Sequence, residues 1–184
     1  MYWETTKFEG VDYNETFALV ARVVIERCIL TLAISKGWSL HQMDIHNAFL
    51  HGDLHEDIYM KPPLGFSPLA PNLVSKLKNS LYSLRQAPRQ WYFKLATVLH
   101  DYGFEQSPLD HSLFVYNQGN VFLALLIYVN DSVLTNNSSS HCSSFKTYLN
   151  KCFKLKELGP LKYFVGIEFA RSLQGHFLCQ RKYT

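Results

Sequence analysis

Cysteine is scarce in this 184-residue chain, and its four copies never form a C-x-x-C pair. The isolated positions Cys28, Cys142, Cys152 and Cys179 argue against both a zinc site and the disulfide framework of a small secreted protein. The first ten residues are polar and mixed in charge, unlike a secretory signal peptide. We therefore expect an intracellular protein, cytoplasmic or nuclear, that is not secreted.

Long apolar runs and a strong charge of one sign are also missing. The longest apolar run covers residues 121–129, which is too short to cross a bilayer, so we expect no membrane association. The formal net charge is only +3. Such a balance permits a nucleic-acid partner but does not require one.

Hydrolase and zinc-enzyme motifs are absent as well. The chain has no G-x-S-x-G sequence and no activated cysteine context, which argues against serine and cysteine hydrolases. His51 and His55 have the i, i+4 spacing of a metal pair, and His41 and His46 lie nearby. No third ligand stands at a matching spacing and H-E-x-x-H does not occur, so solvated loop histidines are the default interpretation.

The chain has enough apolar residues to form a buried core, since 47% of the residues are hydrophobic and 15% are aromatic. The clearest pattern is an apolar strand over 121–127, followed by Tyr128-Val129-Asn130-Asp131 and a second short strand over 132–135. The tetrad is therefore predicted at a hairpin tip, where Asn and Asp tolerate the turn conformations. Such a tip would aim the Asp131 carboxylate rigidly.

A second carboxylate, Asp44, ends a predicted strand over 39–44. Two carboxylates at adjacent strand ends could share divalent metal ions, which favour hard oxygen ligands. Taken alone, Asp44 is more often an N-cap, a turn residue or a paired surface acid, and Asp131 is more often plain turn chemistry. At this level both interpretations stay open.

The remaining periodicities outline the fold. They predict helices over 19–36 and 88–102 and a third after the serines at 138–140, interrupted at 157–160. Further strands are predicted at 112–116 and in a closing hairpin, 163–169 with 177–180, while 61–71 reads as a loop. Strand, helix, hairpin, helix, strand is the split βαβ order of a ferredoxin-like fold. We therefore predict an α+β domain, an antiparallel sheet with helices on one face.

The order of short motifs resembles the reverse transcriptase of copia-type long-terminal-repeat retrotransposons. Asp44 is followed by Asn47-Ala48-Phe49-Leu50, and later by Tyr128-Val129-x-Asp131. Other matching pieces are Lys36-Gly37-Trp38, Ile58-Tyr59-Met60, Ser80-Leu81-Tyr82, Arg85-Gln86-Ala87-Pro88, Ser112-Leu113-Phe114 and Leu161-Lys162-Tyr163-Phe164-Val165-Gly166-Ile167-Glu168. Ordinary structural roles, such as caps, turns and core packing, can explain each of these residues singly but not their joint order.

The resemblance implies an RNA-directed DNA polymerase of which this chain is a truncated, degenerate copy. Residues 1–184 would form the palm and part of the fingers, with 1–12 poorly matched and the thumb and ribonuclease H regions absent. A primer 3′-hydroxyl would attack the α-phosphate of a deoxynucleotide, assisted by two Mg²⁺ ions, or Mn²⁺, roughly 3.5 to 4 Å apart. The implied partners are an RNA or DNA template-primer, deoxynucleotides and other element-encoded proteins.

Residue roles follow from the same resemblance. Asp44 would ligate both metals, Asn130 occupies the position of the other bridging acid, and Asp131 plays a supporting part. The substrate residues would be Phe49 under the deoxyribose, Gln86 at the nucleotide or template, Phe164, Gly166 and Glu168 at the primer end, and Lys156 as proton donor to pyrophosphate. Lys76, Lys78, Arg85, Arg89 and Lys94, interleaved with Tyr82, Trp91 and Tyr92, would contact phosphates and stack bases, or form a solvated helix face.

Several departures from the family pattern predict impairment. The family tetrad is usually Tyr-Val-Asp-Asp, so Asn130 replaces a charged ligand with a neutral amide. Ser83 stands in place of a Gly and Leu19 in place of a Pro, and the basic segment expected upstream of Tyr13 is missing. The alternatives are an impaired or inactive polymerase, a remnant that binds nucleic acid or protein without chemistry, and a chain that does not fold stably.

Overall fold

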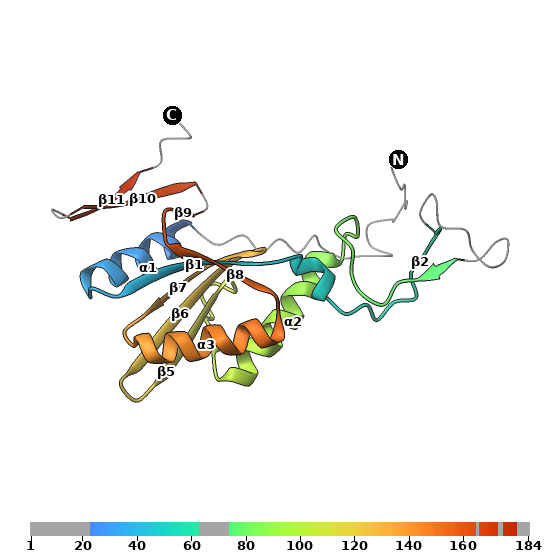
Figure 1. The fold of residues 1–184 in the computed structure, drawn as a ribbon, viewed down its shortest axis with the longest axis horizontal. Helices are drawn as coiled ribbons and strands as arrows, with labels where there is room; N and C mark the ends of the chain where they lie inside the picture. Colours follow the sequence, from blue (N-terminus) through green and yellow to red (C-terminus); the bar gives the residue numbers. More distant parts are fainter. Residues whose placement is uncertain (1–22, 63–73, 165, 173–174, 180–184) are drawn as a thin grey trace.

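The computed structural model describes residues 23–62, 74–164, 166–172 and 175–179. At its centre lies a six-stranded antiparallel sheet with the strand order β4-β5-β6-β7-β1-β8 (Figure 1). Its strands are β1 (Ser39–Ile45), β4 (Glu105–Gln106), β5 (Leu113–Gln118), β6 (Val121–Tyr128), β7 (Asp131–Asn136) and β8 (Leu155–Pro160). Three α-helices occur within the described ranges: α1 (Val23–Ser35), α2 (Ala87–Tyr102) and α3 (Ser139–Cys152).

Four neighbouring strands, β6-β7-β1-β8, form a split βαβ unit. α2 lies between β1 and the β6–β7 hairpin in the chain, and α3 lies between β7 and β8. β1 is therefore inserted between β7 and β8, although both partners come much later in the sequence. This insertion places the end of β1 beside the tip of the hairpin.

Both faces of the sheet are covered, because β6 is apolar at successive positions. Its side chains alternate between two core clusters, with Leu123, Leu125 and Ile127 in the first and Ala124 and Leu126 in the second. The first cluster is closed by α2 and α3, the second by α1 through Leu30 (Figure 1). The prediction that the helices share one face is wrong, since a strand buried on both sides needs cover on both sides.

α2 agrees with its predicted bounds. Pro88 lies in the first turn, where its missing N–H has no helical partner to lose. Gly103 ends the helix with φ 106°, and its N–H donates to the carbonyls of Leu99 and His100. The left-handed conformation at this position favours glycine.

β8 differs from its prediction. Residues 157–160 were predicted to interrupt the third helix, but α3 already ends at Cys152 and the chain pairs with β1 instead. The segment carries Gly159 and Pro160, which disfavour an interior strand but are tolerated at a sheet edge. A bulge in the β1–β8 register between Gln42 and Met43 accompanies the pairing.

A smaller sheet follows β8, in the order β11-β10-β9. Its strands are β9 (Tyr163–Phe164), β10 (Ile167–Ser172) and β11 (Gly175–Cys179), so the predicted closing hairpin is present. Phe164 and Phe169 pack on the second core cluster, on the side of the sheet that α1 covers. The predicted loop from residue 63 onward, and the residues Tyr13 and Leu19, lie outside the described residues.

The connection from β1 to α2 passes through a short 3₁₀ helix, η1 (Ala48–His51), and a two-stranded sheet of β2 (Tyr59–Met60) and β3 (Ser75–Lys76). Gly52 follows η1 and lies directly against α2. A Cβ built on Gly52 would stand 2.9 Å from the backbone nitrogen of Trp91. The absence of a side chain at Gly52 therefore lets η1 pack against the start of α2. Because Phe49 belongs to η1, this packing fixes its position.

Candidate active site

Asp44 and Asp131 lie directly opposite each other in the antiparallel pairing of β1 and β7. Met43 and Ile45 point into the first core cluster, so Asp44 projects from the other face of the sheet. Directly opposed residues have Cβ atoms about 4.5–5.5 Å apart and share a face. The two predicted carboxylates are thus neighbours on one face, at one end of their strands.

The hairpin tip closes this site from the side. The backbone N–H of Ile45 donates to the carbonyl of Asn130 at 3.0 Å, which attaches the tip to the end of β1. Asn130 also donates from its side-chain Nδ2 to Oδ1 of Asp44 at 2.6 Å. The residue at the degenerate position is therefore a direct hydrogen-bond partner of the first predicted metal ligand.

The tip conformation is not the one expected from its sequence. Among the described non-glycine residues only Asn47 and Val129 have positive φ, and Val129 has φ 58°. A positive φ at the first of two central hairpin residues is a feature of type II′ turns, which prefer glycine there. In a β-branched residue such a conformation costs of order 1–3 kcal/mol. The tip therefore stores strain at Val129, and Asn130 does not take the left-handed conformation.

The electrostatics of the pair reflect its burial. Burial raises the pKa of the Asp131 carboxyl above its ordinary value, and the nearby Asp44 carboxylate raises that pKa further. Two acids this close favour a bound cation, because a cation would remove the repulsion that disfavours ionisation. On its other side Asp44 pairs with Lys156 of β8, whose side chain is exposed. Asp44, Asn130, Asp131 and Lys156 are thus brought to one end of the sheet.

Phe49 is placed by η1, five residues after Asp44. Its ring is half-buried against the first core cluster and meets the ring of Tyr82 edge-on, with centroids 4.8 Å apart. Tyr82 is 59% exposed. Gln86 begins α2 and donates from Nε2 to Glu56 at 3.1 Å. The ring contact between Phe49 and Tyr82 joins η1 to the segment before α2, and no spacing in the sequence indicates it.

The three predicted primer residues lie in the β9–β10 segment. Phe164 is buried in the second core cluster, and Gly166 is also buried, with φ 86°. Glu168 is exposed and pairs with Tyr163 across β10 and β9. Phe164 consequently acts in packing, while Glu168 offers its side chain to solvent.

The predicted stacking residues divide into two groups. Trp91 is fully buried and Tyr92 is 7% exposed, so neither ring is available to a base. Tyr82 and Phe93 are exposed instead, and the guanidinium of Arg89 lies 5.5 Å from the centre of the Phe93 ring. Lys76 and Lys94 form ion pairs with Asp57 and Asp53, which lowers the net positive charge of this surface.

Trp91 supports the site from behind. Its indole Nε1 donates to the carbonyl of Val129 at 2.8 Å, so a helix residue holds the hairpin tip. The ring packs edge-on against Phe153, and the His51 ring meets Phe153 edge-on and lies tilted against Trp91. His51 is therefore part of an aromatic cluster. The described residues contain no group of three or more His, Cys, Asp or Glu side chains arranged to hold a metal ion.

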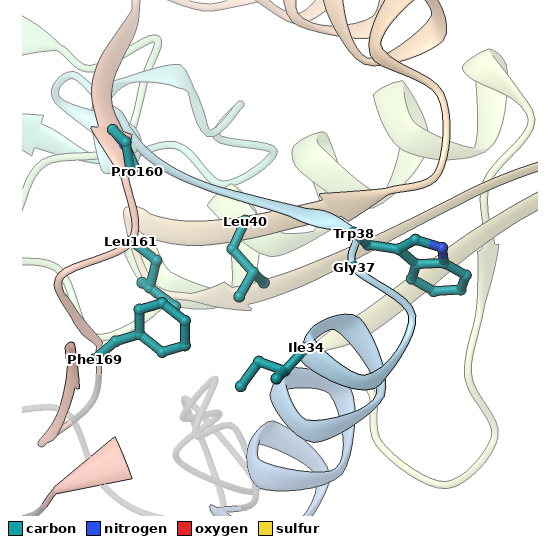
Figure 2. A pocket seen from close by; sticks show the side chains of 7 residues that line it. All are labelled: Ile34, Gly37, Trp38, Leu40, Pro160, Leu161 and Phe169. Carbon is teal, nitrogen blue, oxygen red and sulfur yellow. The ribbon is translucent and has the colours of Figure 1, made fainter. Parts of the chain in front are cut away.

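A separate cavity lies at the opposite end of β1, about 14 Å along the strand from Asp44. It is lined by Ile34, Gly37, Trp38, Leu40, Pro160, Leu161 and Phe169. Figure 2 shows Leu40, Leu161 and Phe169 pointing toward a common space, while the Trp38 indole points away. The cavity has no acidic or basic lining residue, so it is not an extension of the carboxylate site.

Comparison with known proteins identifies the class. Residues 5–184 match the family model for reverse transcriptase (RNA-dependent DNA polymerase). The chain therefore belongs to the reverse transcriptase family, in its copia-type retrotransposon form.

Individual relatives agree. The chain is 40% identical to the retrovirus-related Pol polyprotein from transposon RE2 of Arabidopsis thaliana, over 95% of this chain and 12% of the polyprotein. It is 36% identical to the Pol polyprotein from transposon TNT 1-94 of Nicotiana tabacum, over 95% of this chain and 14% of that protein. A putative transposon Ty5-1 protein of Saccharomyces cerevisiae is 30% identical over 72% of this chain and 44% of its own length.

The chain thus spans only 12% to 14% of the two plant polyproteins. No solved structure matches it. Within the described residues, no helix is long and apolar enough to cross a membrane.

Proposed function

We propose that this chain is the palm, with part of the fingers, of an RNA-directed DNA polymerase that adds deoxynucleotides to a primer on an RNA or DNA template. The observation that carries the proposal is the pairing of Asp44 with Asp131 at one end of a split βαβ sheet. Membership of the reverse transcriptase family supports it. A carboxylate pair on rigid strands is the arrangement that metal-assisted nucleotidyl transfer requires.

The residues fit a divalent cation in part. Asp44 and Asp131 would hold Mg²⁺, or Mn²⁺ in its place, because both are oxygen ligands on one face of the sheet. Burial, and then the neighbouring Asp44 carboxylate, raise the pKa of Asp131, and a bound cation would oppose both effects. When bound, the two ions of such a site activate the attacking hydroxyl and neutralise the leaving oxygen. The amide oxygen of Asn130 can offer a third ligand atom but no charge.

The substrate would lie around the carboxylates. Phe49 would pack under the deoxyribose, and its contact with the exposed Tyr82 extends that surface. Gln86 would reach the nucleotide or template only by leaving Glu56. Glu168, with the backbone at Gly166 and Phe164, would hold the primer end. Lys156, which pairs with Asp44 in the sheet, would protonate pyrophosphate.

Asn130 makes this copy impaired. Two unit charges about 4 Å apart interact by roughly 4 kcal/mol at an effective dielectric near 20. Replacing a carboxylate by an amide removes that attraction to a divalent ion, and each ~1.4 kcal/mol is a tenfold change in rate. The Asn130 amide also takes up one of the acceptor sites of the Asp44 carboxylate, at Oδ1.

The same hydrogen bond favours a second candidate function, a remnant that binds nucleic acid or an element-encoded protein and performs no chemistry. A site held together by an amide needs no cation to be stable. Nucleic-acid binding that weakens with salt but never leads to primer extension would favour this candidate.

Primer extension on an RNA template with Mg²⁺ or Mn²⁺ tests the proposal, comparing this chain with Asn130→Asp and with Asn130→Asp combined with Asp44→Ala. We expect little or no extension by the chain, a gain on Asn130→Asp, and loss of that gain in the double variant. If all three are inert although each unfolds cooperatively, the polymerase proposal fails and the binding remnant replaces it.

A further inference from the structure

The hairpin tip that carries Asn130 and Asp131 is held by contacts to two different elements. The carbonyl of Val129 accepts from the Trp91 indole of α2 at 2.8 Å. The next carbonyl, that of Asn130, accepts from the Ile45 N–H at the end of β1 at 3.0 Å. Two consecutive carbonyls of one turn are thus fixed by two different elements, one by a helix and one by a strand.

The Val129 contact matters because the conformation at Val129 is strained. A β-branched residue with φ 58° persists only where its surroundings determine it. The pairing of β6 with β7 fixes the chain on both sides of the turn, but it ends at the pair Tyr128 and Asp131 and does not include Val129. The orientation of the Val129 peptide therefore depends on the indole N–H.

Trp91 is itself unable to move with the tip. Its side chain is fully buried, and its ring meets Phe153 edge-on with centroids 5.0 Å apart. The Gly52 backbone lies against the Trp91 backbone nitrogen, which fixes this turn of α2 from outside. A buried indole N–H also needs an acceptor, and the Val129 carbonyl provides it.

We propose that Trp91 is a positioning residue of the carboxylate site: its indole N–H holds Val129 in the left-handed conformation and thereby holds the Asn130 amide against Asp44. Its relevance to nucleotidyl transfer rests on the proposed function, but the positioning itself does not. The residue acts through the turn and touches neither carboxylate in any described contact.

The test is nuclear magnetic resonance of the whole chain without metal, following the Asn130 side-chain amide and hydrogen exchange of the Ile45 backbone amide. Trp91→Phe keeps a buried ring and removes the donor. We expect it to shift the Asn130 amide signal toward that of a solvated asparagine and to speed Ile45 exchange at least tenfold beyond the change in global stability. Val129→Gly in the Trp91→Phe background should restore both signals, because glycine takes positive φ without strain.

Tyr148→Phe is the matched control. It removes another side-chain hydrogen bond in the same core cluster, from the Tyr148 hydroxyl to the carbonyl of Val98 at 3.1 Å. We expect it to leave the Asn130 and Ile45 signals in place at whatever cost in stability. If Trp91→Phe behaves like this control, the proposal is overturned and Trp91 has a packing role only.

The Trp91→Phe variant loses the hydrogen bond of the buried Trp91 indole and could fail to fold. Should Trp91→Phe fail to fold, the double variant with Val129→Gly decides: cooperative unfolding with the Asn130 signal restored supports the proposal, and absence of either overturns it.

In the Asn130→Asp background, we expect Trp91→Phe to lower kcat with little change in the KM for deoxynucleotide. Inertness of Asn130→Asp would defeat the polymerase proposal alone, since the spectroscopic result needs no activity.

Discussion

Asn130 Nδ2 and Asp44 Oδ1 are 2.6 Å apart, and the residues that carry them are 86 positions apart in the sequence. The bond joins the tip of the β6–β7 hairpin to the end of β1. An amide donor thus satisfies one oxygen of a carboxylate that we propose as a metal ligand. The stability of the site in this chain and its proposed loss of activity have the same cause.

Asn130→Asp should make the fold dependent on divalent ions. Without metal we expect the free energy of unfolding to fall by about 2–4 kcal/mol, because a hydrogen bond to a charged group is lost and a third carboxylate joins Asp44 and Asp131. Millimolar Mg²⁺ or Mn²⁺ should recover part of that loss. Urea denaturation with and without chelator measures both effects.

Asn130→Ala is the control for that change, since it removes the bond without adding charge. We expect its unfolding free energy to be insensitive to the ions. An equal response of the two variants to metal would contradict a metal site at this position.

Glu26 should make stability fall as pH rises. It is fully buried on α1, and neither carboxylate oxygen has a hydrogen-bond partner among the residues that the structure describes. Burial raises the pKa of Glu26 from 4.5 to about 7, against a smaller lowering by Arg27. The folded state holds the proton more tightly than the unfolded state. Its contribution is therefore complete below about pH 4.5 and is lost as pH rises through about 7, a change of up to roughly 3 kcal/mol. Glu26→Gln should flatten this part of the profile of unfolding free energy against pH. An unchanged slope would show that other groups cause it.

Gly52→Ala should destabilise the chain by about 1–3 kcal/mol, because the added Cβ would lie 2.9 Å from the Trp91 nitrogen and 3.0 Å from Cβ of Gln90. Its φ of −69° suits any residue, so the cost is steric only. Gly37→Ala provides the contrast: it has open space but a φ of 66°. Thermal unfolding compares them, and we expect the tip signals of Asn130 to change only in Gly52→Ala.

His41 should lose its stabilising contribution in acid. Burial lowers the pKa of His41, Lys146 lowers it further, and Glu157 opposes both. Because the folded-state pKa lies below the unfolded value of 6.5, the contribution is present above that pH and is lost as pH falls through the folded-state pKa. Lys146→Met should raise the His41 pKa and Glu157→Gln should lower it, as followed by imidazole resonances. Shifts of the same sign would contradict this account.

Much of the sheet could be predicted from the sequence. The apolar run that became β6, the hairpin after it and the helix between Pro88 and Gly103 depend on local pattern and turn chemistry, which act over a few residues. From the predicted strands, Asp44 and Asp131 could be placed at adjacent strand ends, but only the family resemblance favoured their pairing over ordinary turn roles. No local signal relates positions so far apart.

Other features depend on tertiary contacts and escaped prediction. α1 covers the face of the sheet opposite α2 and α3. The periodicity of α1 shows that it has a buried side, but not which face of the sheet that side packs against. β8 became a strand because β1 offered it a partner, despite Gly159 and Pro160. Val129 takes a conformation that its side chain disfavours, since Trp91 supplies a partner from another element.

The insertion of β1 between β7 and β8 also determines when the site can exist during synthesis. Asp44 is made before both neighbours of its strand, which follow only after α2, the β5–β6 hairpin and, for β8, α3. Contacts of such long sequence separation form slowly, because a large loop must close first. Until then the edges of β1 remain unpaired. A nascent chain interrupted before β7 would therefore carry an exposed strand and no carboxylate pair.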